Sequence, residues 1–204
     1  MNPESRTART SRTVRTVRAV RADEWEKARE LRLAALRDPV AHLAYLDTYE
    51  AAVERPDSVW RENTARAAES GEGKIRQFVA EESDGRWVGA VTVLLELAGQ
   101  ELPFGASPET AQTHLVGVYV RPEARGSGVI DELFRTALEW SWAHPERVER
   151  VRLYVHGENG RAAAFYRRFG FVPSGARVPV PGHTTAMEVE YEMRRGGGGG
   201  AVSG

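Results

Sequence analysis

The chain has 204 residues, of which 41% are hydrophobic and 28% charged, and its formal net charge at pH 7 is −1. A chain of this size and balance is predicted to form one globular domain with a core of its own. The sequence contains no cysteine, which excludes disulfides, thiolate metal sites and cysteine nucleophiles, and we expect no metal site.

The chain begins with a basic segment. Six arginines and one glutamate give residues 1–21 a net charge of +5, so the remaining residues together carry −6. Residues 1–12 are predicted to form a disordered basic arm. Such an arm is typical of nucleic-acid-binding proteins, but the near-neutral total charge and the acidic remainder argue against a nucleic acid as the partner.

A strand and three helices are predicted to follow the arm. The strand covers residues 13–20. Asp23 and Glu26 have the spacing of a capping box and begin a helix that stops at Asp38 and Pro39. Further helices are predicted over residues 42–53 and from Asp57 or Ser58 to about residue 69.

The pattern then changes to strands with two more helices. Strands are predicted over residues 75–82, 87–97, 113–120, 148–155, 171–178 and 187–193, and helices from about 127 to 143 and over 159–169. The first two of these strands form a hairpin. The strands at 113–120 and 148–155 are separated by a helix, which makes them candidates for parallel neighbours. The domain is expected to span residues 13–195, with a flexible glycine-rich tail over 196–204.

No segment is predicted to enter a membrane. The longest apolar run, residues 88–95, is far too short to span a bilayer. No apolar stretch of a secretory signal stands near the N-terminus. We therefore expect no membrane partner and a cytoplasmic location.

The stretch "RPEARGSGVIDELF", residues 121–134, is predicted to bind a phosphate. Gly126 and Gly128 let the backbone approach an anion at the N-terminus of a helix, and Arg125 adds positive charge. A P-loop is excluded because the loop has no lysine, and a dinucleotide fingerprint fits poorly because Asp131 stands where its third glycine belongs.

Two stretches resemble the GNAT superfamily of acyl-CoA-dependent N-acetyltransferases. "VYVRPEARGSGV" is similar to the family's pyrophosphate motif R/Q-x-x-G-x-G/A, with Ile130 as a departure at the last position. "LYVHGENGRAAAFYRRFGFVPSG" is similar to its N-x-x-A-x-x-x-Y segment, with Asn159, Ala162 and Tyr166. The resemblance covers residues 13–195. It implies an α+β fold with a mixed, mostly antiparallel central sheet, a splayed parallel strand pair and four to five helices.

The resemblance also implies acetyl-CoA as the cosubstrate and a set of residues that hold it. The cofactor-binding candidates are Val118, Val120, Arg125, Gly126, Ser127, Gly128, Val129, Ile130, Asn159 and Tyr166. Tyr166 matches the tyrosine that protonates or orients the leaving sulfur. Its alternative is a core tyrosine with a satisfied hydroxyl, and the alternative for Asn159 is a helix N-cap. Gly117 is expected to form a bulge that splays its strand from the strand at 148–155.

The sequence gives fewer constraints on the residues that would bind the acceptor amine. His114 is a candidate general base that accepts a proton directly or through water, and a strand histidine without a catalytic part is equally compatible with the pattern. Candidates for the acceptor-side lining are Tyr45, Tyr49, Glu50, Trp60 and His183. The side chain of Ile130 is expected to face the sheet, at the start of the apolar stripe of its helix.

These observations predict an N-acetyltransferase that moves an acetyl group from acetyl-CoA directly to a primary amine of a small molecule or a protein. A non-catalytic acyl-CoA-binding module with the same fold is the alternative, and Ile130 is the feature in its favour. The sequence leaves open the identity of the acceptor and whether the chain forms a homodimer.

Overall fold

The computed structural model describes residues 15–103, 105–181 and 185–196. The predicted basic arm and all but the first residue of the predicted tail lie outside these ranges. In chain order the elements are β1 (Arg15–Ala19), α1 (Trp25–Leu36), the 3-10 helix η1 (Ala41–Leu43), α2 (Tyr49–Val53), α3 (Asp57–Ala67), β2 (Ile75–Glu82), β3 (Trp87–Glu96), β4 (Gln112–Val120), the 3-10 helix η2 (Pro122–Ala124), α4 (Val129–Ala143), β5 (Arg150–His156), α5 (Gly160–Phe169), β6 (Val172–Pro179) and β7 (Met187–Arg194).

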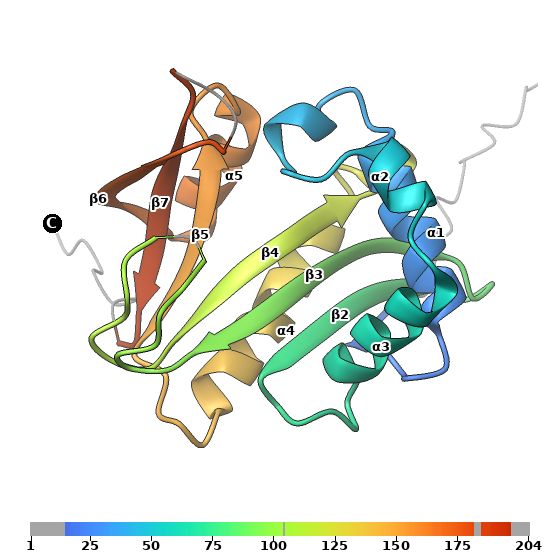
Figure 1. Cartoon of the computed structure of the whole chain (residues 1–204), viewed down its shortest axis with the longest axis horizontal. Helices are drawn as coiled ribbons and strands as arrows, with labels where there is room; N and C mark the ends of the chain where they lie inside the picture. Colours follow the sequence, from blue (N-terminus) through green and yellow to red (C-terminus); the bar gives the residue numbers. More distant parts are fainter. Residues whose placement is uncertain (1–14, 104, 182–184, 197–204) are drawn as a thin grey trace, which may run out of the picture.

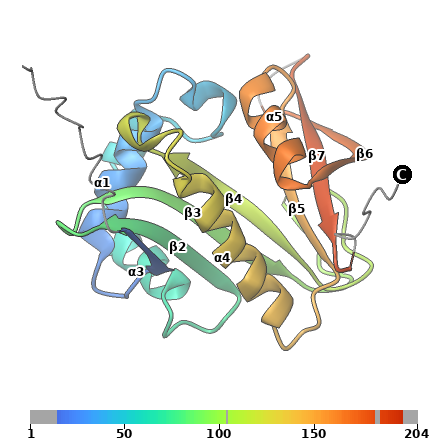
Figure 2. The same ribbon diagram turned by 180° about the vertical axis from the view of Figure 1, so that it is seen from behind.

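The strands form one seven-stranded sheet in the order β1-β2-β3-β4-β5-β7-β6. Every neighbouring pair is antiparallel except β4 and β5, which are parallel. Helices α1 and α3 lie on one face of the sheet (Figure 1), and α4 and α5 lie on the other (Figure 2). The predicted α+β fold with a mixed sheet is therefore confirmed. In the described part of the chain, no helix is long and apolar enough to cross a membrane.

The parallel strands β4 and β5 pair only at their beginnings. Their register joins residues 112–114 to residues 150–152, and beyond that point the two strands diverge (Figure 1). Between the pairs Ala90–Tyr119 and Thr92–Val116 on β3 and β4, strand β4 contains one residue more than β3. At this point β4 has two residues, Gly117 and Val118, where β3 has one, and the φ of Gly117 is 61°. The predicted bulge at Gly117 is confirmed, and it turns the end of β4 away from β5.

Helix α4 packs closely on the sheet because a glycine of β3 makes room for it. A Cβ atom at Gly89 would lie 2.9 Å from the carbonyl oxygen of Tyr119 and 3.2 Å from a methyl carbon of Val129. The buried residues of α4 include Leu133, Phe134, Ala137 and Leu138 of the predicted stripe, and they begin at Val129, one position before Ile130. Ile130 is half-buried and packs on the edge of the core.

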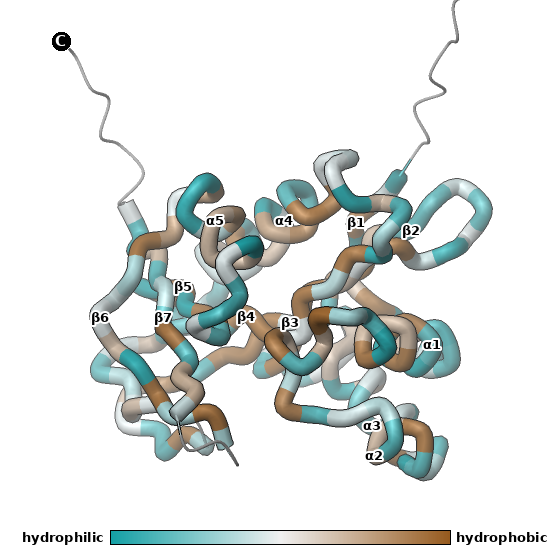
Figure 3. The backbone as a smooth tube through the Cα atoms, turned by 90° about the horizontal axis from the view of Figure 1, so that it is seen from above, coloured by the Kyte–Doolittle hydropathy of each residue, from teal (hydrophilic) through white to brown (hydrophobic). Residues whose placement is uncertain are grey.

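The core continues from α4 to α5 through aromatic rings. Phe134 lies 5.1 Å from Phe165 and 5.6 Å from Tyr166, measured between ring centroids. Hydrophobic residues also follow β3 and β4 through the middle of the molecule (Figure 3). These contacts fix α5 against the sheet at the end where β4 and β5 diverge.

Two local predictions in the first third of the chain are wrong. The helix predicted over residues 42–53 is two short helices, η1 and α2, and the second begins where the Thr48 hydroxyl accepts a hydrogen bond from the Ala51 N–H. Helix α1 is not capped by Asp23. Glu24 is its N-cap residue, and its carboxylate accepts from the Arg21 N–H and pairs with Arg18 at 2.6 Å.

Candidate active site

The loop after β4 has the backbone geometry of an anion site. Gly126 and Gly128 have φ values of 77° and 85°, which residues with a side chain rarely adopt. Gly128 is the N-cap of α4 and no side chain caps the helix, so the first N–H groups of α4 are open to a ligand. The Ser127 hydroxyl donates to the carbonyl oxygen of Ala124 at 2.7 Å and closes the turn.

Arg125 is already engaged by protein groups. Its guanidinium is ion-paired with Asp38, just beyond the end of α1, and donates a hydrogen bond of 3.0 Å to the carbonyl oxygen of Val120. The pair joins two segments that are 87 residues apart in the sequence. Arg125 therefore positions the loop against α1 in addition to placing positive charge there.

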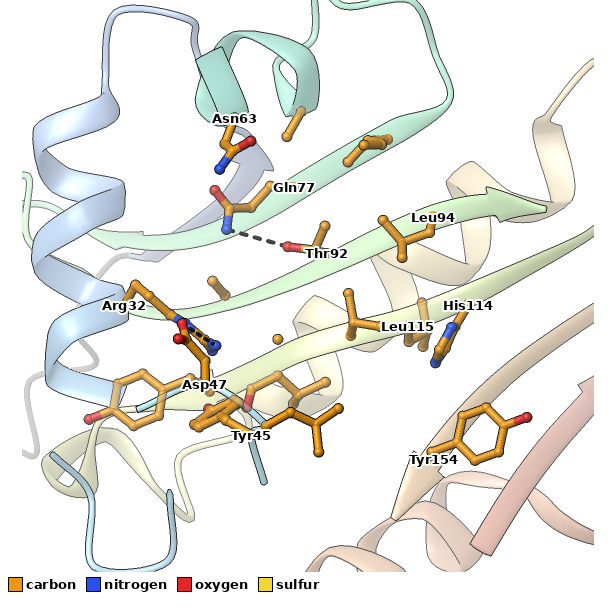
Figure 4. Close-up of a pocket in the computed structure, with 18 of the residues that line it drawn as sticks. Arg32, Tyr45, Asp47, Asn63, Gln77, Thr92, Leu94, His114, Leu115 and Tyr154 are labelled. Carbon is orange, nitrogen blue, oxygen red and sulfur yellow. Dashed lines mark hydrogen bonds and ion pairs between the residues drawn. The ribbon is translucent and has the colours of Figure 1, made fainter. Parts of the chain in front are cut away.

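Two cavities lie on either side of the point where β4 and β5 diverge. The first, which we call the loop cavity, has a volume of about 780 Å³ and is lined by residues 124–131 of the loop and α4 (except Ser127) together with α5. The second, which we call the sheet cleft, has a volume of about 1280 Å³ and is lined by α1, α3 and strands β2 to β5 (Figure 4). Seven residues line both cavities: Ala44, Tyr45, Val118, Tyr119, Asn159, Ala162 and Tyr166. The two cavities thus meet at the splay.

Tyr166 stands at this junction. Its side chain is buried, with 7% of its surface exposed, and its ring packs on Phe134 and Phe171. No described residue forms a hydrogen bond with its hydroxyl. Burial raises the pKa of Tyr166 above its ordinary value.

Asn159 has a structural role at the same place. Its side-chain oxygen accepts a hydrogen bond of 3.1 Å from the Ala162 N–H and so caps α5. Its side-chain nitrogen donates to the carbonyl oxygen of Leu43 at 3.4 Å. The N-cap interpretation is confirmed, and Asn159 also lines both cavities.

A segment between α1 and α2, residues 41–47, crosses over the splay and reaches α5 (Figure 1). The hydroxyl of Tyr45 donates a hydrogen bond of 2.8 Å to the carbonyl oxygen of Val118 in the bulge. Arg32 stacks on the Tyr45 ring at 4.3 Å, and Asp47 is held by Arg55 at 2.6 Å. The segment therefore covers the junction between the cavities.

His114 belongs to a buried ionic cluster at the paired end of β4 and β5. Its Nδ1 atom lies 3.2 Å from a carboxylate oxygen of Glu96, and Arg152 donates two hydrogen bonds of 2.8 Å to the same carboxylate. Burial opposes ionisation of Glu96, but the hydrogen bonds from His114 and Arg152 prevail and lower its pKa to about 2. Figure 4 shows His114 and Tyr154 facing each other across the two strands, with ring centroids 5.4 Å apart.

His114 lies far from the junction. Val118 is four positions further along β4, which corresponds to about 13 Å of extended strand. An amine placed at the splay is therefore out of direct reach of the imidazole. A water-mediated role and a strand histidine without a catalytic part both fit this position.

Glu188 on β7 is a residue of the site that the sequence analysis missed. Three carboxylates line the sheet cleft, namely Asp47, Glu96 and Glu188. The first two are paired with arginines, whereas the carboxylate of Glu188 has no ion pair or hydrogen bond with any described residue. Burial raises the pKa of Glu188 to about 7. The sequence does contain a signal that was not used. Glu188, Glu190 and Glu192 alternate along one strand, and this alternation indicates a charged face.

The other acceptor-side candidates have different outcomes. Tyr45 and Trp60 line the sheet cleft, and Trp60 is buried with its indole nitrogen unpartnered in the described structure. Tyr49 and Glu50 do not line either cavity, and the Tyr49 hydroxyl accepts a hydrogen bond from Arg37. His183 lies outside the described residues.

Comparison with known proteins gives a consistent result. A family model described as the acetyltransferase (GNAT) family matches residues 25–171. No curated protein sequence matches the chain significantly.

Solved structures of low sequence identity share the fold. An acetyltransferase of the GNAT family from Streptococcus pneumoniae superposes with a TM-score of 0.66 at 15% identity, covering 89% of this chain and 100% of that chain. Arabidopsis thaliana NAA60 in complex with acetyl-CoA superposes with a TM-score of 0.63 at 16% identity, covering 89% of this chain and 98% of that chain. The PaiA N-acetyltransferase from Thermoplasma acidophilum in complex with coenzyme A gives 0.61 at 16% identity, covering 87% and 98%.

Proposed function

Because the chain belongs to the acetyltransferase (GNAT) family, we propose that it transfers an acetyl group directly from acetyl-CoA to a primary amine of a small molecule or a protein. The observation that carries this proposal is the meeting of the loop cavity and the sheet cleft at Tyr166 and Val118. A thioester that enters from one side and an amine that enters from the other would meet there. The proposed catalytic domain spans residues 13–195.

The loop cavity suits coenzyme A. The open N–H groups of α4 and the positive φ values of Gly126 and Gly128 support pyrophosphate binding over residues 126–130, with Arg125 beside them. The backbone of Val118 and Val120 would pair with the pantetheine arm at the splayed end of β4. Asn159 would contact the cosubstrate while it caps α5.

Transfer needs a proton donor for the departing sulfur. In the proposed reaction the amine nitrogen forms a bond to the thioester carbon, and the bond from that carbon to sulfur breaks. Burial keeps the Tyr166 hydroxyl protonated at neutral pH, and the hydroxyl donates its proton to the sulfur as negative charge develops there. The nitrogen loses a proton after attack, and Tyr166 recovers one through solvent or through His114 and intervening water.

The test is thiol release from acetyl-CoA in the presence of a panel of primary amines. The chain has no cysteine, so a thiol reagent reports only free coenzyme A. Amine-dependent release and a mass increase of one acetyl group on the amine support the proposal. Tight acetyl-CoA binding without release above the amine-free rate for any amine would instead support the non-catalytic module.

A further inference from the structure

We propose that the carboxylate of Glu188 binds the incoming amino group of the acceptor and takes the first proton that this group must lose. This inference rests on the proposed function and adds a catalytic residue outside both sequence motifs. Glu188 lies on β7, a strand that neither motif includes.

The first argument is position. Glu188 lines the sheet cleft together with Asn159 and Tyr166, which are two of the seven residues that also line the loop cavity. Burial, followed by the charges of Tyr45 and Glu188, raises the pKa of Tyr166. An amine held by Glu188 would therefore stand beside the hydroxyl proposed to receive the sulfur.

The second argument is charge. Along one face of β7, Glu190 is bound by Arg150 and Arg152, and Glu192 is bound by Arg150 and Arg194. Glu188 continues this face without a cation from any described residue. Burial of an ionised carboxylate without a partner is costly, and an ammonium ion would remove that cost. The cleft therefore offers one position for a cationic amino group.

The third argument concerns the neighbouring groups. Among the described residues, the titratable side chains that pair with Glu188 or line the same cleft near it are His156, its register partner on β5, Tyr154 on the same strand, Tyr166 on α5 and Tyr45 from the covering segment. Its partner on β6, Val178, is uncharged. The tyrosines are poor proton acceptors because burial raises the pKa of Tyr45, Tyr154 and Tyr166. A carboxylate whose pKa is near 7 is suited to accept a proton at neutral pH.

The proton balance is complete. An acceptor with an ammonium group gives one proton to Glu188, which releases it to solvent, and the neutral nitrogen then attacks the thioester. The second proton leaves the nitrogen after attack and replaces the one that Tyr166 gives to sulfur. No oxidant, reductant or metal ion takes part.

The test compares Glu188→Gln with Glu146→Gln, which removes an exposed carboxylate in the turn after α4. For an amine found in the screen, Glu188→Gln is expected to lower kcat/KM at pH 7 by about 10²-fold. The loss should shrink as the pH approaches the pKa of the free amine, because the amine then loses its proton unaided. The Kd for acetyl-CoA should match that of the wild type and of Glu146→Gln.

Two results would overturn the inference. One is a kcat/KM of Glu188→Gln that stays within about threefold of the wild type from pH 6 to 9. The other is equal binding of n-butylamine by the wild type and Glu188→Gln, measured by calorimetry with coenzyme A present. If no amine releases thiol but n-butylamine binding depends on Glu188, the proposed function fails while the amine site stands.

Discussion

The hydroxyl of Tyr45 donates a hydrogen bond of 2.8 Å to the carbonyl oxygen of Val118, the residue that follows the positive-φ glycine in the bulge of β4. The two residues are 73 positions apart, and their contact places the segment of residues 41–47 over the junction of the two cavities. If the pantetheine arm pairs with Val118, it competes with Tyr45 for the same carbonyl group.

Tyr45→Phe should therefore bind acetyl-CoA more tightly than the wild type. Loss of one hydrogen bond that the ligand must displace corresponds to roughly a 2- to 10-fold lower Kd. Calorimetric titration with acetyl-CoA measures the Kd. Tyr49→Phe is the matched control because Tyr49 lines neither cavity. A Kd that rises in Tyr45→Phe would show that the hydroxyl contacts the ligand instead of competing with it.

Tyr166→Phe should lower kcat without weakening acetyl-CoA binding. The phenylalanine keeps the ring contacts with Phe134 and Phe171, and only the unpaired hydroxyl is lost. Removal of a general acid costs about 10²-fold in rate. Steady-state kinetics with an accepted amine give kcat, and calorimetry gives the Kd. An unchanged kcat would refute the acid role.

Ile130→Ala should bind acetyl-CoA at least as tightly as the wild type. Ile130 is half-buried at the wall of the loop cavity, and alanine restores the small residue of the family motif without opening the buried stripe, which begins at Val129. The Kd and the melting temperature test this together. A marked loss of affinity in a stably folded variant would show that the isoleucine side chain is part of the binding surface.

Glu96→Gln should destabilise the fold by about 3 kcal/mol. The substitution removes one of the two carboxylates that pair with Arg152, and Arg152 is buried, with 1% of its surface exposed. The control Glu123→Gln breaks a pair with Arg86 whose side chains are about half exposed, and it should cost far less than Glu96→Gln because water screens an exposed pair. Urea unfolding at pH 7 measures both. Equal midpoints in the two variants would mean that the buried cluster contributes little net stability.

Stability should also depend on pH in two separate windows. The pKa of Glu96 is lowered from 4.5 to about 2 in the folded state, so its stabilising contribution is complete above pH 4.5 and is lost as the pH falls toward 2. The pKa of Glu188 is raised from 4.5 to about 7, so the folded protein keeps a proton that the unfolded chain releases, and stability falls as the pH rises through this window.

The loss from Glu188 amounts to at most about 3 kcal/mol. Glu188→Gln should abolish the decline between pH 4.5 and 7. Glu96→Gln should make the decline below pH 4.5 shallower without removing it, because the pKa values of Glu24, Glu81 and Glu190 are also lowered in the folded protein. Urea midpoints across pH 3 to 8 measure both effects. Parallel pH profiles for the wild type and Glu188→Gln would contradict the raised pKa of that carboxyl.

Features set by local sequence were predicted well. The bounds of β2, the bulge at Gly117 and the end of α5 at Gly170 follow from alternation and from residues that accept positive φ. Features that depend on contacts between residues far apart in the sequence were not predicted. The break between η1 and α2 depends on Tyr45 reaching Val118, and the pairing of Arg125 depends on Asp38.

The candidate site divides in the same way. The motif residues Tyr166 and Asn159 line both cavities, and their roles in binding and catalysis stay predictions. Glu188 was missed because it differs from its neighbours Glu190 and Glu192 only in its partners. Arginines pair with those two carboxylates, whereas none in the described part of the chain pairs with Glu188, and this difference appears only when the strands are assembled. Tyr49 failed as a lining candidate because the turn before α2 carries it away from the cleft.

Gly89 has a consequence for how this chain tolerates change. The contact distances there leave no space for a Cβ atom between β3, the carbonyl oxygen of Tyr119 and the first buried turn of α4. Any larger residue must displace the carbonyl oxygen of Tyr119 on β4 or the side chains of Leu133 and Val129 on α4. A shift of α4 would carry the open N–H groups of residues 129–131 with it. The geometry of the loop is thus determined in part by a position outside it, so a homologue with an intact loop but a bulky residue at position 89 would be expected to hold its anion differently.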